Sequence, residues 1–284
     1  MIDGSAPDDP HTVPAAPRLA YTDTGAGPDG GPGAGTAVVL LHSLGADRRM
    51  WRDQVTALRG RHRVVVPDTR GHGASDWAGP VDVDDWVADL RRVLDAAGVT
   101  RAALVGVSLG GIQALAYAAA FPEQTSALVV ADSFVELPED VAEAKISGLA
   151  GQAASEGMPA VADAYVHDTF TRTPPPDGAG PLRDAIAGMD ADAYAASVRA
   201  CFGVRIADRL AAIRAPTLVL WGNADQKTPR PLSERIAAGV AGAELREIPG
   251  AGHLSNLENP AAFTEQIDGF AGHAARRTGA SGES

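Results

Sequence analysis

Few folds accommodate the five short runs of almost uninterrupted apolar residues in this chain. The runs read AVVLLH at 37–42, RVVVP at 63–67, AALVGV at 102–107, ALVVA at 127–131 and PTLVLW at 216–221, and a more polar sixth run, ELREI, follows at 244–248. Continuous apolar character is expected of parallel strands that are covered on both faces. Segments with helical spacing lie between the runs. The alternation therefore predicts an α/β protein with a mostly parallel central sheet, flanked by helices and connected by right-handed crossovers.

Two of the intervening helices have clear sequence signals. Within 82–97, apolar residues such as Trp86, Leu90 and Leu94 recur at spacings that form one stripe of a helix. Asn259 followed by Pro260 is a favourable cap and first-turn pair for a last helix. Both helices are amphipathic, as expected for segments that cover a sheet.

The alternation is interrupted between residues 134 and 206, and the chain ends lack core-forming residues. The 134–206 segment is rich in Ala and contains no convincing strand, so it predicts a helical cap inserted into the sheet domain. A Gly- and Pro-rich stretch at 25–35 predicts a long loop. The predicted organisation begins with a disordered tail at 1–17. The core domain consists of 18–133 and 207–272, with the cap at 134–206 inserted between them. A flexible tail at 273–284 follows.

The charge balance restricts the partners of the chain. It carries 36 acidic residues against 24 basic ones, a formal charge of −12, which repels nucleic acid and anionic membrane surfaces. The same negative charge disfavours small anionic substrates at long range, although one local Arg can reverse that effect inside a pocket. With a single cysteine, Cys201, the chain forms no intrachain disulfide, and we expect this residue to be an inert part of a helix. No signal peptide or membrane span is recognisable, so a cytoplasmic protein is expected.

The segment from Gly106 to Gly111 has the pattern of a nucleophile elbow. Ser108 lies in a G-x-S-x-G motif that directly follows a buried run and precedes an apolar helical segment. The turn must be so tight that Gly106 and Gly110 are needed on either side. The serine would then project above the sheet at a helix N-terminus, where the backbone N–H of Leu109 can stabilise a developing oxyanion.

A serine hydroxyl needs a base, and His253 is the best placed of the seven histidines. It lies in the turn-rich segment PGAGHLSNLENP, after the run at 244–248 and before the last helix. Loops that follow parallel strands emerge at one sheet edge, so His253 is expected beside Ser108. The other candidates lie in the chain ends, at the opposite edge, or in the cap, where contact with substrate is conceivable: His11, His273, His62 and His167.

The third member of a triad would be a carboxylate that fixes the imidazole tautomer. Asp225, in LWGNADQKTP, follows the run at 216–221, and the chain order Ser, Asp, His is the one that this kind of site uses. Asp132 directly follows the run at 127–131 and remains the alternative acid. Asp225 is preferred.

A second oxyanion donor is expected from the loop after the run at 37–42. There the backbone N–H of Leu44 is the candidate. His42 and His72 lie in glycine-containing loops and are predicted to be structural. No metal-ligand spacing and no nucleotide-binding glycine motif is present, so neither a metal nor a cofactor is expected.

Five segments together resemble the α/β-hydrolase superfamily over about residues 36–272: LLHSLGADRRMW, VVPDTRGHGAS, LVGVSLGG, PTLVLWGNAD and IPGAGHLSNLENPAAF. Within it they look most like 3-oxoadipate enol-lactonase and its relatives. The resemblance implies the α/β-hydrolase fold and a cofactor-free enzyme that acts on carboxylated ring lactones. The glycine-rich loop, the N-terminal tail and the segment TRTPPPDGAGP at 171–181 depart from that family.

For this sequence the resemblance implies Ser108 as nucleophile, His253 and Asp225 as its partners, and the amides of Leu44 and Leu109 as oxyanion donors. The expected function is hydrolysis of a small ester or lactone through an acyl-enzyme. Alternatives on the same residues are a carbon–carbon bond hydrolase and an esterase or cyclase that tailors a natural product. A ligand-binding module without catalysis is the alternative of another class. The oligomeric state is not predicted.

Overall fold

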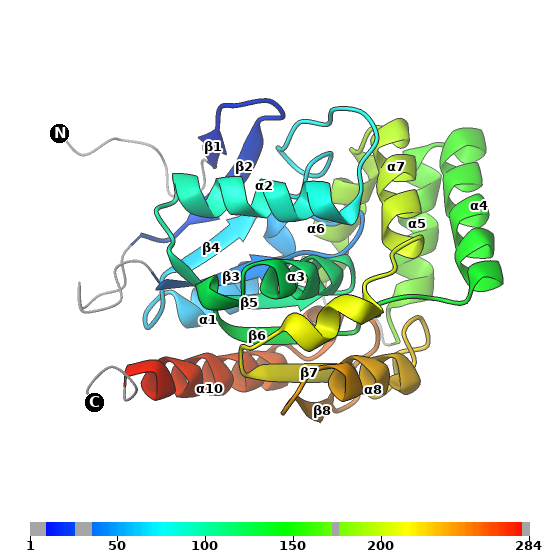
Figure 1. The fold of residues 1–284 in the computed structure, drawn as a ribbon. Helices are drawn as coiled ribbons and strands as arrows, with labels where there is room; N and C mark the ends of the chain where they lie inside the picture. The colour runs from blue at the N-terminus through cyan, green and yellow to red at the C-terminus, as the bar shows by residue number, and fades with distance from the viewer. Residues whose placement is uncertain (1–9, 26–35, 172–175, 280–284) are drawn as a thin grey trace.

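The computed structural model describes residues 10–25, 36–171 and 176–279. Its central feature is an eight-stranded sheet in the order β1-β2-β4-β3-β5-β6-β7-β8 (Figure 1). Neighbouring strands from β4 to β8 are parallel, and β1 and β2 form an antiparallel edge. The strands are β1 His11–Val13, β2 Leu19–Asp23, β3 Thr36–Leu41, β4 Val64–Pro67, β5 Arg101–Val107, β6 Thr125–Ala131, β7 Thr217–Gly222 and β8 Glu244–Ile248. All six predicted runs are therefore strands.

Helices cover both faces of this sheet. Those of the core are η1 Arg48–Trp51, α1 Arg52–Leu58, α2 Val83–Ala96, α3 Leu109–Ala120, η2 Pro122–Gln124, η3 Ala207–Ala212, α8 Arg230–Gly239, α9 Ser255–Glu258 and α10 Pro260–Gly279. In Figure 1, α2, α3 and α8 lie in front of the sheet, whereas α1 and α10 pack against each other behind it. The predicted α/β-hydrolase fold, with a mostly parallel sheet and flanking helices, is confirmed.

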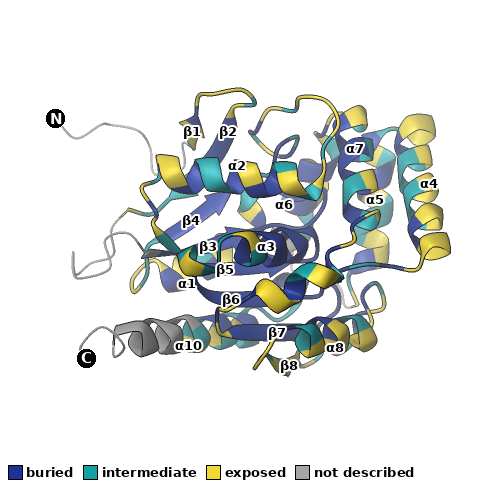
Figure 2. Ribbon diagram, in the orientation of Figure 1, coloured by how far each residue is buried: buried dark blue, intermediate teal, exposed yellow. Residues whose placement is uncertain are grey.

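Local sequence explains where the helices begin and which faces they bury. The side chain of Asp82 accepts hydrogen bonds from the backbone N–H groups of Asp84 and Asp85. The side chain of Asp85 in turn accepts one from the backbone N–H of Asp82, which completes a capping box at the start of α2. Helix α3 is buried on almost every side, because β3, β5 and β6 lie beneath it and other helices flank it (Figure 2). This rigid buried unit carries Ser108 at its N-terminus.

The interruption at 134–206 contains four helices, α4 Glu139–Glu156, α5 Met158–Thr169, α6 Pro176–Ala187 and α7 Ala191–Phe202. They stand together beyond one end of the strands, at the right of Figure 1. We call this insertion the cap. Its outer surface is exposed along α4, whereas α7 buries most of its length (Figure 2). The predicted helical insertion is confirmed.

Two expectations about the ends of the chain need correction. His11–Val13 lies in the predicted tail but forms β1, because it pairs with β2 and His11 stacks on Tyr21 at 5.3 Å. Helix α10 continues to Gly279, beyond the predicted end of the core at 272. Residues from Pro176 onward in the Pro- and Gly-rich cap segment are helical and belong to α6. The loop expected at 25–35 falls almost entirely outside the described residues, as do 1–9, 172–175 and 280–284.

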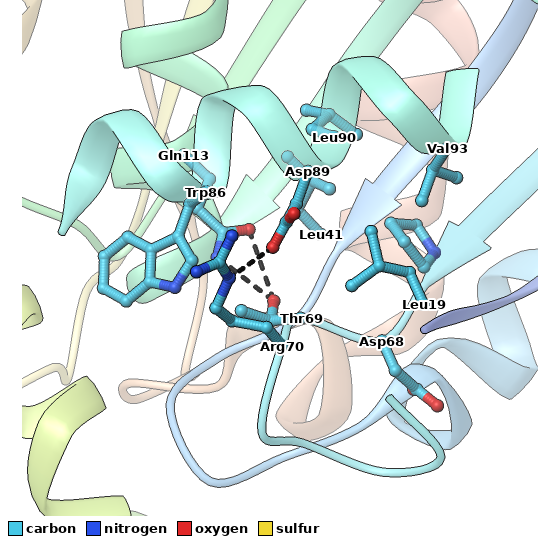
Figure 3. Close-up of a pocket in the computed structure, with 11 residues that line it drawn as sticks. Leu19, Leu41, Asp68, Thr69, Arg70, Trp86, Asp89, Leu90, Val93 and Gln113 are labelled. Atoms are coloured by element: carbon cyan, nitrogen blue, oxygen red, sulfur yellow. Dashed lines mark hydrogen bonds and ion pairs between the residues drawn. The ribbon is translucent and has the colours of Figure 1, made fainter. Parts of the chain in front are cut away.

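A small cavity of about 20 Å³ lies inside the core, beneath α2 (Figure 3). There the Arg70 guanidinium donates to the carboxylate of Asp89, and the Gln113 side chain bonds the Thr69 hydroxyl. The ion pair is almost fully buried, and its charges satisfy each other. This cavity is too small for a substrate and contains none of the predicted site residues.

In the described part of the chain, no helix is long and apolar enough to span a membrane.

Candidate active site

Ser108 occupies a strained turn between β5 and α3. Its backbone has φ +56° and ψ −116°, a region that residues with a Cβ rarely adopt. The glycines on either side are required by space: a Cβ on Gly106 would lie 2.1 Å from the carbonyl oxygen of Gly110, and one on Gly110 would lie 2.0 Å from that of Leu41. The predicted elbow is thus present, and it aims the Ser108 hydroxyl away from the sheet.

The structure brings the three predicted side chains together from loops far apart in sequence. The imidazole Nε2 of His253 lies 3.1 Å from the Ser108 Oγ, and its Nδ1 lies 3.0 Å from Oδ2 of Asp225. All three side chains are buried, with Ser108 and His253 slightly exposed toward a cavity. In this geometry His253 can accept the Ser108 proton at Nε2, while Nδ1–H donates to Asp225.

The Asp225 carboxylate is held rigidly by its own loop. Its Oδ1 accepts hydrogen bonds from the backbone N–H groups of Lys227 at 2.7 Å and Thr228 at 3.1 Å, and its Oδ2 accepts one from the Thr228 hydroxyl. Burial alone would raise the pKa of Asp225, but the hydrogen bonds and charge of His253, together with those from Thr228, outweigh burial and lower it. Asp225 therefore stays ionised and orients the imidazole.

The alternative acid, Asp132, lies in the same region but bonds elsewhere. Its Oδ1 accepts from the Gly222 N–H at 2.8 Å, and its Oδ2 contacts the hydroxyl of Ser255 at 2.5 Å. Burial, reinforced by the negative charge of Asp225, raises the pKa of Asp132 well above its usual range. Asp132 thus joins the end of β7 to the segment that carries His253, and it is not the partner of the imidazole.

The raised pKa of Asp132 has a measurable consequence for stability. Because folding raises the pKa of Asp132, this group makes the folded protein less stable as the pH rises from its pKa in the unfolded state toward its pKa in the folded state. Asp132→Asn is close in shape but does not ionise, so it lacks this pH-dependent cost, and its melting temperature relative to that of wild type should rise as the pH rises from 4 to 8. Thermal unfolding of both proteins across this range measures the difference. Asp132→Ala, which leaves the Gly222 N–H unpaired, should be destabilised at every pH. A pH-independent difference for the Asn variant would contradict a raised pKa of Asp132.

Leu44 and Leu109 carry the two backbone amides that were predicted as oxyanion donors. Leu109 is the first residue of α3, so its N–H has no partner within the helix. Leu44 lies on the loop after β3 and lines the same cavity as Ser108, and among the described residues its N–H donates to no other group. Both amides are thus free to donate to a charge that develops beside Ser108.

The other histidines considered from sequence occupy structural or exposed positions. His42 bridges two loops, because its Nδ1 lies 2.9 Å from the carbonyl of Ser43 and its Nε2 accepts the N–H of Thr69. Burial lowers the pKa of His72 to about 3, so it is neutral. These contacts agree with the structural roles predicted for both. His167 is exposed on α5, bonds Asp168, and does not line the cavity beside Ser108.

The cavity beside Ser108 lies between core and cap and has a volume of about 250 Å³. Its wall is mostly apolar and aromatic, with few polar groups: Leu44, Ser108, Phe134, Leu137, Ala144, Lys145, Gly148, Leu149, Tyr165, Tyr194, Cys201, Phe202, Lys227, Thr228 and His253. A more open hollow of about 430 Å³, between the loops at 47–49 and 71–77 and helix α6, includes none of the three triad side chains. The smaller cavity is therefore the candidate active site.

Several lining residues were not predicted from sequence. Thr228 supports Asp225, and its Oγ1 also lies 3.3 Å from Nδ1 of His253. Lys145 and Tyr165 come from the cap, whose contacts cannot be assigned without a structure. Burial raises the pKa of Cys201 to about 12, which agrees with the inert thiol that was predicted. No group of three or more His, Cys, Asp and Glu side chains suited to a metal occurs among the residues described.

Comparison with known proteins supports this assignment of fold and class. The chain is similar to 3-oxoadipate enol-lactonase 1 of Acinetobacter baylyi, with 30% identity over 84% of this chain and 90% of that protein. It is 28% identical to a 2-hydroxy-6-oxononadienedioate/2-hydroxy-6-oxononatrienedioate hydrolase of Paraburkholderia phymatum, covering 90% of this chain and 91% of the relative. Among solved structures, the enol-lactonase from Burkholderia xenovorans LB400 superposes with a TM-score of 0.79 at 29% identity, over 89% of this chain and 96% of that one.

These relatives are hydrolases, and the predicted resemblance to enol-lactonase-like enzymes is confirmed. The model of a single family, described as the alpha/beta hydrolase family, matches residues 38–266, which include every residue of the candidate site. The chain belongs to the alpha/beta hydrolase family and is a hydrolytic enzyme.

Proposed function

We propose that this enzyme cleaves a small ester or lactone through a covalent acyl-Ser108 intermediate. The observation that carries the proposal is the position of His253, whose two ring nitrogens lie within hydrogen-bond distance of the Ser108 hydroxyl and the Asp225 carboxylate. This is the arrangement that converts a weak hydroxyl into a nucleophile. The enol-lactonase relatives support a lactone or ester as the substrate.

The proposed reaction begins when His253 removes the proton of Ser108 as Oγ attacks the substrate carbonyl carbon. The carbonyl oxygen becomes an oxyanion, which the N–H groups of Leu44 and Leu109 stabilise. The C–O bond to the leaving group then breaks, and His253 donates its proton to the departing alkoxide or enolate. A water molecule, deprotonated by His253, attacks the acyl-enzyme and restores Ser108. In a lactone the leaving oxygen stays attached to the acyl group.

The cavity limits the size of the substrate. Its volume of about 250 Å³ lies just below the range of roughly 300–1,000 Å³ typical of pockets for drug-sized ligands. Apolar and aromatic lining residues favour a compact, partly apolar acyl group. Products formed from enol-lactones, aryl esters and β-diketones distinguish ester hydrolysis from carbon–carbon cleavage on the same residues.

Labelling by a fluorophosphonate tests the proposal directly. The reagent should form one covalent adduct, on Ser108, and should abolish hydrolysis of lactones and short aryl esters in parallel with the labelling. Mass spectrometry of peptides locates the adduct, and Ser155→Ala, an exposed serine on α4, is the matched control that should label like wild type. A protein that neither labels nor hydrolyses any ester would instead be a ligand-binding module.

A further inference from the structure

Ser133 is a buried polar residue that the proposed reaction does not use. It follows the end of β6 by two residues and is fully buried. Its hydroxyl donates a hydrogen bond of 2.7 Å to the backbone carbonyl of Ser108. That carbonyl also accepts the backbone N–H groups of Gly111 at 2.9 Å and Ile112 at 3.2 Å, at the start of α3. Ser133 therefore adds a third donor to a carbonyl that the helix already satisfies.

The sequence leaves room for this hydroxyl at Gly111, the glycine that follows the elbow motif. A Cβ at position 111 would lie 2.6 Å from the Oγ of Ser133 and 2.6 Å from its Cβ. The backbone of Gly111 is helical and does not have a positive φ, so its conformation alone does not require glycine. Close packing against Ser133 is therefore a reason why a larger residue does not fit there.

A similar bond occurs on the loop after β3. The Nε2 of the fully buried His42 accepts the backbone N–H of Thr69 at 2.9 Å, so this nitrogen carries no proton. The ring proton is therefore on Nδ1, which donates to the carbonyl of Ser43 at 2.9 Å. The Ser43 carbonyl also accepts the backbone N–H of Ala46 at 3.1 Å. Like the carbonyl of Ser108, it thus has a side-chain donor as well as a backbone donor.

Both carbonyls belong to the peptide groups that carry the predicted oxyanion donors. The N–H that follows the Ser43 carbonyl is that of Leu44, and the N–H that follows the Ser108 carbonyl is that of Leu109. Because a peptide group is planar and trans, a bond that holds its carbonyl also fixes the direction of its N–H. Such a bond in addition polarises the peptide group, which strengthens the next hydrogen bond in the chain by about 10–30%.

We propose that His42 and Ser133 are positioning residues that orient and polarise the oxyanion amides of Leu44 and Leu109. Neither side chain touches the substrate, and each acts through one peptide group. An oxyanion forms in both acylation and deacylation, so the two residues accelerate the chemical steps without strengthening the binding of an uncharged ester. This inference rests on the proposed hydrolysis at Ser108.

Ser133→Ala tests the bond to the elbow. In hydrolysis of 4-nitrophenyl acetate, kcat should fall by about tenfold while KM stays within about twofold, because the lost stabilisation acts only in the transition state. Thr217→Val is the control. It also removes a buried hydroxyl that donates to a backbone carbonyl, that of Ala215 at 2.9 Å, but at the first residue of β7 and far along the strand from the site. Both variants should lose a similar melting temperature, and only Ser133→Ala should lose kcat.

His42 allows a matched pair of substitutions. Asparagine places its amide nitrogen where Nδ1 lies and keeps the bond to the Ser43 carbonyl, whereas glutamine places its amide oxygen near Nε2 and keeps the bond from the Thr69 N–H. Each variant therefore loses one of the two hydrogen bonds. His42→Gln should lower kcat by about tenfold with KM unchanged, and His42→Asn should retain most of the wild-type kcat. Equal losses of kcat in the two variants would show that the ring is merely structural, and the proposal would be wrong.

Binding of butylboronic acid separates this inference from the proposed function. The Oγ of Ser108 adds to the boron, and the tetrahedral adduct resembles the oxyanion intermediate without any turnover. Its Kd, measured by calorimetry, should rise in Ser133→Ala and His42→Gln by the factor by which kcat falls, and Thr217→Val should bind like wild type. The same weakening in a protein that hydrolyses no ester would retain the positioning role and reject the hydrolase mechanism. Hydrolysis at Ser108 with unchanged kcat in both variants would reject the positioning role alone.

Discussion

Ser108→Ala should lower kcat/KM for any ester or lactone substrate by at least about 10⁴-fold, approaching the 10⁶-fold loss in kcat measured for nucleophile removal in a serine protease. Alanine cannot form the acyl-enzyme, and without the hydroxyl the remaining rate comes only from the oxyanion amides and substrate binding. The substitution should slow the chemical step without disturbing the fold. Alanine retains the Cβ, so the strained backbone at position 108 is unchanged.

Stability and binding provide the controls for this variant. The free energy of unfolding should change by no more than about 1 kcal/mol, because only one hydrogen bond, to Nε2 of His253, is lost. Denaturant unfolding measures the free energy of unfolding, and steady-state kinetics measures kcat/KM. His253→Ala should cause a rate loss of similar size, and the double variant should lose little more, since the two groups act as one unit. Turnover by Ser108→Ala at wild-type rates would show that another group is the nucleophile.

Gly106→Ala should destabilise the protein by about 3 kcal/mol or more, at the upper end of the cost of overpacking. The added Cβ would lie 2.1 Å from the Gly110 carbonyl oxygen and 2.6 Å from the Gly111 nitrogen. Both are backbone atoms of the elbow and the first turn of α3, so no side-chain rotation relieves the clash. Relief would require movement of the turn that aims Ser108, and activity should fall together with stability.

Gly151→Ala is the matched control for the same chemical change. Gly151 lies within α4, and a Cβ there would meet no other atom within 4 Å. Alanine favours helix over glycine by up to about 1 kcal/mol, so this variant should be slightly more stable than wild type and fully active. Denaturant unfolding of both variants provides the comparison. Wild-type stability in Gly106→Ala would contradict the packing described around the elbow.

The sheet and the elbow were predictable because their signals are local. Strands buried on both faces need continuous apolar runs, and the clash at Gly106 and Gly110 leaves glycine as the residue that fits. The predicted meeting of Ser108, His253 and Asp225 follows from topology, since the loops after parallel strands share one edge. The choice between Asp225 and Asp132 was harder. Both follow strands at that edge, and only their hydrogen-bond partners separate them.

Features that depend on contacts across the fold escaped prediction. Strand β1 has three residues and no apolar run, and its pairing with β2 supplies the stability that its sequence lacks. Lys145 lies on an Ala-rich helix with no distinct apolar stripe. Which side of this helix faces the cavity beside Ser108 therefore depends on how the cap packs on the core. Lys227 lies two residues after Asp225 and was overlooked. The rarity of lysine in this chain was the available signal.

The cap joins the core through two connections, after β6 and before β7, and shares the substrate cavity with it. A chimera that received residues 134–206 from another hydrolase would keep Ser108, His253 and Asp225 in place. It would, however, exchange only one side of the cavity, replacing Lys145 and retaining Lys227. Transplanted selectivity would therefore be incomplete. Grafts on this scaffold should carry the short segment 226–228 along with the helices, since selectivity is encoded jointly by both.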